Sequence, residues 1–168
     1  SLEIGVNHLY HSKFDNMTND KILEYIKEFK SDNIFAIAEI LSRDVDIQTV
    51  HEITKITPLF LECIKDIVEM EKKLANAPQD EKVLLEAKKM GFSDAYIAKL
   101  WKQTELEVNA FRKQKGIKPV YKMVDTLHSG AYIPYFYSTY TGENDSIITK
   151  KEKAIVLGSG PIRIGQGV

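Results

Sequence analysis

The sequence lacks the features of a membrane protein and of a disulfide-linked fold, and it has no excess of charge of one sign. Cys63 is its only cysteine, which excludes an intrachain disulfide and a cluster of thiolate ligands. No apolar run approaches the roughly 20 residues that cross a bilayer, and residues 1–10 lack the pattern of a signal peptide. The 23 basic and 24 acidic residues nearly cancel and are spread along the chain, which argues against a nucleic acid or an anionic membrane as partner. These absences predict a cytoplasmic protein.

The first two thirds of the chain have the apolar spacing of amphipathic helices. The pattern predicts a helix after Thr18 that uses Phe29 in its apolar stripe, followed by helices over 34–41 and 47–54. The longest helix is expected to start with Thr57 as its N-cap and Pro58 in its first turn, and to stop before Pro78. Its predicted stripe, on whose side Cys63 also falls, is apolar except at one glutamate: Phe60, Leu61, Ile64, Ile67, Val68, Glu71 and Leu74.

Capping residues predict three further helices. Asp80 is expected to start a helix that ends before Gly91, a short one covers 95–101, and the last covers 105–115. Thr104 and Glu107 have the spacing of a capping box at the start of the last helix. The sequence therefore predicts a mainly α fold, a bundle of about six or seven short to medium helices.

After residue 117 the composition changes. β-Branched and aromatic residues alternate with glycine and proline, which favours extended segments. The polar stretch 142–153 is typical of a linker, and Ala154–Leu157 is predicted to be a short buried strand. The aromatic residues of this region fit either packing under a loop or a subunit boundary: Tyr132, Tyr135, Phe136, Tyr137 and Tyr140.

A glycine-rich segment, 158–167, follows the predicted strand directly. Gly158, Gly160 and Gly165 approximate a phosphate-binding loop, with one residue too many and a proline inside it. Glycines that only form a tight turn explain the same pattern. The sequence ends before a helix or a ribose-binding carboxylate, so no complete cofactor site is expected in this segment.

Residues 91–117 have the pattern of two short helices joined by a turn, which a DNA-binding helix-turn-helix also shows. Glu105 and Glu107 stand at the start of the second helix, where they would face the phosphates of DNA. Their negative charge argues against DNA binding. Packing of the two helices against each other explains the same apolar residues. DNA binding is therefore the alternative hypothesis.

No group of residues has the spacing of a catalytic or metal site. His8 and His11 are close enough to share a metal, but no third ligand type clusters beside them. The aromatic residues Tyr96, Trp101 and Phe111 are the candidates for a protein interface, with packing in the core as the alternative for all three.

The chain resembles the middle of the large chain of carbamoyl phosphate synthetase over almost its full length. The segments that carry the resemblance occur in the family's order: Val50-His-Glu-Ile-Thr-Lys-Ile-Thr57 followed by Phe60-Leu61, Lys89-Met-Gly-Phe-Ser-Asp94, Lys118-Pro-Val-Tyr-Lys-Met-Val-Asp-Thr126, Tyr135-Phe-Tyr-Ser-Thr-Tyr140 and Glu152-Lys-Ala-Ile-Val-Leu-Gly-Ser-Gly-Pro-Ile-Arg-Ile-Gly-Gln-Gly167. Residues 127–132 depart from the family pattern, so contacts made by that loop are not carried over.

The resemblance implies a domain organisation. In this family a helical oligomerisation domain joins two ATP-grasp synthetase units. By this resemblance, residues 14–149 are the joining domain, 1–13 are the end of the first unit or a linker, and 150–168 begin the second unit. The family's nucleotide-binding and catalytic residues lie outside this segment, so none is assigned here.

The resemblance also implies a function for the parent chain. The whole enzyme is an ATP-dependent carbon–nitrogen ligase that makes carbamoyl phosphate from bicarbonate, glutamine-derived ammonia and two molecules of ATP with magnesium, for pyrimidine and arginine synthesis. It pairs with a glutaminase small chain. The segment itself is expected to be a non-catalytic scaffold that fixes the two units and contributes to self-association of large chains.

Overall fold

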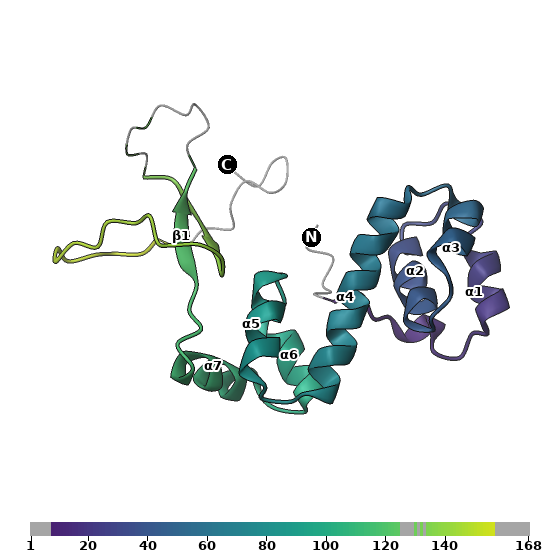
Figure 1. The fold of residues 1–168 in the computed structure, drawn as a ribbon, viewed down its shortest axis with the longest axis horizontal. Helices are drawn as coiled ribbons and strands as arrows, with labels where there is room; N and C mark the ends of the chain where they lie inside the picture. Colours follow the sequence, from purple (N-terminus) through teal and green to yellow (C-terminus); the bar gives the residue numbers. More distant parts are fainter. Residues whose placement is uncertain (1–7, 125–129, 131, 133, 157–168) are drawn as a thin grey trace. The chain divides into compact units, whose positions relative to one another are not determined.

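The computed structural model describes residues 8–124, 130, 132 and 134–156 (Figure 1). The contacts between residues divide the chain into two units, with the division between Lys118 and Pro119. The helical unit ends at Lys118, and the bounds of the joining domain, 14–149, stay a prediction. The second unit, as far as it is described, contains a β-hairpin.

The mainly α fold predicted from the sequence is confirmed. The described residues form seven α-helices and a 3-10 helix, Ser12–Phe14. The α-helices are α1 (Asn19–Tyr25), α2 (Asn33–Ser42), α3 (Ile47–Thr54), α4 (Pro58–Asn76), α5 (Glu81–Lys89), α6 (Asp94–Trp101) and α7 (Glu105–Gln114). Among the described residues, no helix has the length and apolarity that a bilayer crossing requires.

The long helix α4 connects two groups of helices (Figure 1). Helices α2 and α3 contact α4, and α1 packs on α2. Helices α5 and α6 also contact α4, and α7 packs on α6. The first group encloses a core of fully or nearly fully buried side chains: Phe14, Ile22, Ile26, Phe35, Ala36, Ile37, Ile40, Leu41, Val50 and Leu61. Helix α4 therefore holds the helical unit together and supplies side chains to both groups.

The helix starts follow the capping residues of the sequence. Asp80 accepts hydrogen bonds from the backbone N–H groups of Lys82 and Val83, and the capping box between Thr104 and Glu107 is present in full. At the end of α5, Gly91 has a φ of 92°, a left-handed conformation that glycine adopts without steric cost. Local chemistry thus fixes these boundaries.

The predicted apolar stripes include residues that are exposed, among them Phe29, Phe60 and Cys63. Phe29 is 98% exposed, because α1 ends at Tyr25 and Phe29 lies beyond it. On α4 the buried side follows Leu61, Val68 and Leu74, and Phe60 lies about 100° around the helix from Leu61. Phe60 is 62% exposed, and Cys63 is exposed as well. The prediction of a buried Phe60 and Cys63 was wrong because the helices that pack on α4 leave this side open.

The extended segments predicted after residue 117 form an antiparallel hairpin of β1 (Val120–Met123) and β2 (Phe136–Thr139). Val120 pairs with Thr139, and Met123 pairs with Phe136. The predicted strand 154–157 is not formed over residues 154–156, which are exposed and have no partner strand in the described structure. An extended segment needs such a partner for its backbone hydrogen bonds.

Candidate functional site: a pocket among α2, α4 and α6

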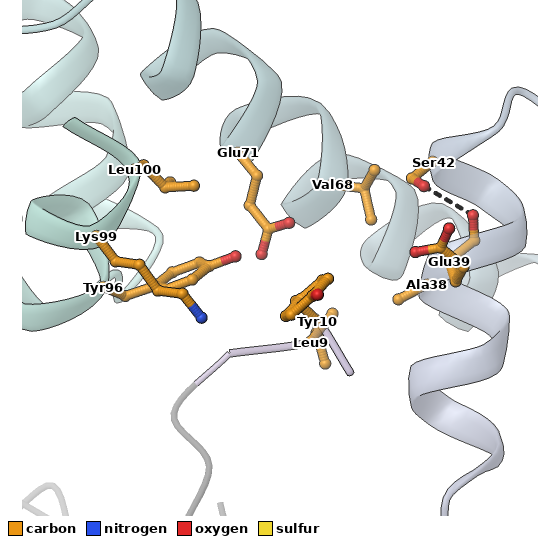
Figure 2. Close-up of a pocket in the computed structure, with 10 residues that line it drawn as sticks. All are labelled: Leu9, Tyr10, Ala38, Glu39, Ser42, Val68, Glu71, Tyr96, Lys99 and Leu100. Carbon is orange, nitrogen blue, oxygen red and sulfur yellow. Dashed lines mark hydrogen bonds between the residues drawn. The ribbon is translucent and has the colours of Figure 1, made fainter. Parts of the chain in front are cut away.

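A pocket of about 380 Å³ lies within the helical unit (Figure 2). Its wall is formed by residues 9–10 and by side chains of α2, α4 and α6. Most of these side chains are apolar or aromatic, and four polar groups come from the helices: Glu39 and Ser42 on α2, Glu71 on α4 and Lys99 on α6. Glu39 is already paired with Arg43 at 2.7 Å.

Glu71 is the polar exception in the apolar stripe of α4, and the pocket explains its position. It lies three residues after the buried Val68 and three before the buried Leu74, so its side chain points to the same side of the helix. Its Oε1 atom is buried and has no hydrogen-bond partner among the described residues. Burial raises the pKa of the Glu71 carboxyl, against the opposing effects of the Tyr96 hydroxyl and the Lys99 charge.

Helix α6 places Tyr96 and Lys99 on the other side of the pocket. The Tyr96 hydroxyl points toward the Glu71 carboxylate (Figure 2), and burial together with the charge of Glu71 raises the pKa of Tyr96 well above its ordinary range. Its hydroxyl therefore remains a donor at any physiological pH. The Lys99 Nζ atom lies 3.4 Å from His8 Nε2 and 5.1 Å from the centre of the Tyr10 ring.

His8 lies beside Tyr96 and Lys99. Its ring stacks on Tyr96 with 4.8 Å between ring centres. Burial, followed by the nearby charge of Lys99, lowers the pKa of His8, so the ring is neutral at pH 7 and its Nε2 can accept from Lys99. The Nδ1 atom of His11 accepts from the backbone N–H of Lys13. In the part of the chain that the structure describes, no three His, Cys, Asp or Glu residues are grouped as metal ligands would be.

The three aromatic interface candidates differ in exposure. Tyr96 and Trp101 are buried, at 5% and 7% exposed, and Phe111 is half-buried. Trp101 Nε1 donates to the carbonyl oxygen of Leu74 at 2.9 Å, and its ring meets Phe111 edge-on at 6.1 Å. Core packing was the alternative to an interface for all three residues. Tyr96 and Trp101 are packed within the helical unit. Their part in an interface stays a prediction.

The other sequence hypotheses also have places in the structure. The helix pair predicted in 91–117 is α6 and α7, whose Ile97 and Val108 are fully buried, so the pattern is explained by packing. The Glu107 carboxylate is occupied by the capping box of α7. DNA binding itself is not tested by these contacts. The glycine candidates Gly158, Gly160 and Gly165, like residues 125–129, lie outside the described residues.

A second polar cluster, which the sequence did not indicate, joins α5, α6 and α7. Asp94 accepts from Lys88 Nζ at 2.7 Å, from Arg112 Nε and Nη2 at 3.1 and 3.0 Å, and from Asn109 Nδ2 at 3.2 Å. Lys88 and Arg112 are both buried at 7% exposure. Burial alone would raise the pKa of Asp94, but these hydrogen bonds together hold it below its ordinary value. The cluster is a structural connection between helices.

Replacing Glu71 with glutamine tests the burial of its carboxylate. Because its pKa is raised on folding, folding is most favourable when Glu71 is protonated, and stability falls as the pH rises from the ordinary carboxyl pKa through the raised value. Glu71→Gln should therefore raise the melting temperature at pH 7 by a few degrees and change it little near pH 4. Thermal denaturation followed by circular dichroism at both pH values checks this. The exposed neighbour Glu69 provides the control, since Glu69→Gln should alter neither value; a lower melting temperature for Glu71→Gln at pH 7 would contradict the prediction.

The helical unit agrees with a known domain family. Residues 1–116 match the family described as carbamoyl-phosphate synthetase large chain, oligomerisation domain. The match extends from the start of the sequence to Gly116, two residues after the end of α7, and so includes every helix of the described residues and both polar clusters. It covers more than half of the 168 residues and does not include the hairpin. The chain therefore belongs to the family of carbamoyl-phosphate synthetase large chain oligomerisation domains.

Proposed function

We propose that this chain is the non-catalytic domain that joins the two synthetase halves of a glutamine-dependent carbamoyl phosphate synthetase and mediates self-association of its large chains. The family match supports this role. In this proposal residues 14–149 are the joining domain and 1–13 and 150–168 belong to the flanking synthetase units. The parent enzyme is cytoplasmic, uses ATP and magnesium, and works with a glutaminase small chain to supply carbamoyl phosphate for pyrimidine and arginine synthesis.

The observation that carries self-association is an exposed apolar surface at the start of α4, which we call the α4 strip: Leu59, Phe60 and Cys63. Leu59 and Phe60 are 61% and 62% exposed, and Cys63 is exposed. Residues four apart in a helix lie on one side, so Leu59 and Cys63 are neighbours on the surface and Phe60 flanks them. Large apolar side chains grouped in this way are typical of interface centres. A second copy of the chain is the occupant that the family description favours.

A double charge substitution in the α4 strip tests this proposal. Leu59→Glu/Phe60→Glu places two carboxylates in the strip, where they would be desolvated in an interface. Both positions lie in the first turn of α4, where negative charge favours the helix, so the fold should be kept. Sedimentation velocity over a range of concentrations should show self-association weakened at least about tenfold. Leu106→Glu is the matched control, because Leu106 is 81% exposed in the first turn of α7.

The possible outcomes separate the parts of the proposal. If the unaltered chain stays a monomer, or if a full large chain lacking residues 15–149 keeps the oligomeric state of the intact large chain, the domain does not mediate self-association. Equal weakening by Leu106→Glu would exclude the α4 strip as the specific surface. In a symmetric dimer, residues of the interface that lie near the twofold axis come close to their own copies. Cys63 is the only cysteine, so oxidative cross-linking into a covalent dimer that the double variant prevents gives independent support.

A further inference from the structure

The pocket of Figure 2 contains two opposite charges that do not pair with each other or with another charged side chain. Oε1 of Glu71 is buried without a hydrogen-bond partner among the described residues. Lys99 faces the pocket from α6 (Figure 2) and makes no ion pair within the described part of the chain, where its Nζ atom lies 3.4 Å from Nε2 of the neutral His8 ring. A buried carboxylate oxygen without a partner is costly, so its retention needs an explanation.

The rest of the wall is suited to an apolar group. Leu9 and Tyr10 approach from the N-terminal segment, Val68 lies one turn before Glu71 on α4, and Leu100 follows Lys99 on α6 (Figure 2). The volume of about 380 Å³ lies in the range of small-molecule sites, which are mostly apolar with a few polar groups that fix the orientation of the ligand.

We propose that this pocket binds a small zwitterion, an α-amino acid with an apolar side chain. The ligand's ammonium group donates to Oε1 of Glu71, and its carboxylate accepts from Nζ of Lys99. Its side chain lies against Leu9, Val68 and Leu100. Each charge of the ligand meets its opposite, so the buried carboxylate oxygen obtains a donor and Lys99 obtains a counter-ion. The proposal does not depend on the proposed self-association, because the α4 strip contributes no residue to this pocket.

Three matched probes test the charge requirement in the 168-residue chain labelled with ¹⁵N. They are L-leucine, its decarboxylated amine 3-methylbutylamine, and its deaminated acid 4-methylpentanoate. Leucine should produce saturable shifts of the backbone amide signals of Tyr96 and Leu100 in two-dimensional NMR spectra. Each analogue lacks one charge-assisted contact and should bind at least about tenfold more weakly. The absence of shifts with leucine, or equal binding of either analogue, would overturn the proposal.

Substitutions then assign the two contacts. Glu71→Gln and Lys99→Gln should each weaken leucine binding at least about tenfold, while the amide spectra show that the fold is kept. Glu69→Gln on α4 and Lys89→Gln at the end of α5 remove equivalent charges from exposed positions outside the pocket. These controls should leave binding unchanged. Leucine binding that survives both pocket substitutions would place the ligand elsewhere and overturn the assignment.

Discussion

Replacing Asp94 with alanine is expected to lower the free energy of unfolding by about 3–5 kcal/mol, the range found when one partner of a buried ion pair is removed. The side chain of Asp94 is only 10% exposed and faces the buried Lys88 and Arg112. The substitution removes the carboxylate that neutralises Lys88 and Arg112, and these two cations stay buried between α5, α6 and α7. Urea denaturation followed by circular dichroism measures the loss, and an unchanged denaturant slope would show that the folded state remains compact.

A matched control separates burial from ion pairing alone. Glu81 on α5 pairs with Lys115 across 3.5 Å, but the two side chains are 55% and 39% exposed. Such exposed pairs contribute less than about 1 kcal/mol, so Glu81→Ala should have a small effect. Equal losses for Asp94→Ala and Glu81→Ala would show that the buried cluster contributes no more than a surface pair.

The Asp94 effect should also depend on pH. The pKa of Asp94 is held below its ordinary value in the folded chain, so its stabilisation is present above the ordinary carboxyl pKa and is lost as the pH falls through the lower folded value. The difference in stability between the unaltered chain and Asp94→Asn should therefore be full at pH 7 and shrink in acid. A difference that stays constant down to pH 2 would contradict an ionised Asp94.

The sequence predicted the helices well because their ends depend on local chemistry. The expected range 47–54 is identical to α3, and the capping box correctly placed the start of α7. Each of these signals involves residues within four positions of one another, so no knowledge of the tertiary structure was required.

Features that depend on packing between distant segments were harder to predict. The apolar stripe of α4 gave no indication that α2 and α3 would leave Phe60 and Cys63 exposed. The cluster around Asp94 joins residues 18 positions apart, and in the sequence Asp94 is indistinguishable from a residue that starts a helix. For the pocket, one signal was present: Glu71 interrupts an otherwise apolar stripe. The residues that face it from α6 were visible only in the structure.

Replacing Trp101 with alanine is the second substitution with a large expected effect, a loss of about 3–5 kcal/mol in the free energy of unfolding. The ring is 7% exposed, packs against Phe111 and donates to the Leu74 carbonyl oxygen on α4. Trp101→Phe keeps much of the packing and loses the hydrogen bond, so a smaller loss of about 1–3 kcal/mol is expected. Urea denaturation of both variants, with the exposed Leu106→Ala as control, measures these values.

The variant Trp101→Phe also decides between core packing and an interface role for Trp101. If Trp101 acts only within the helical unit, Trp101→Phe should lower stability while sedimentation velocity shows unchanged self-association under conditions where the chain stays folded. If its indole group contacts a second copy, self-association should weaken by more than the loss of folded chain accounts for. The buried ring and its hydrogen bond to Leu74 favour the first result, since a side chain already enclosed by α4, α6 and α7 has little surface left to offer a partner.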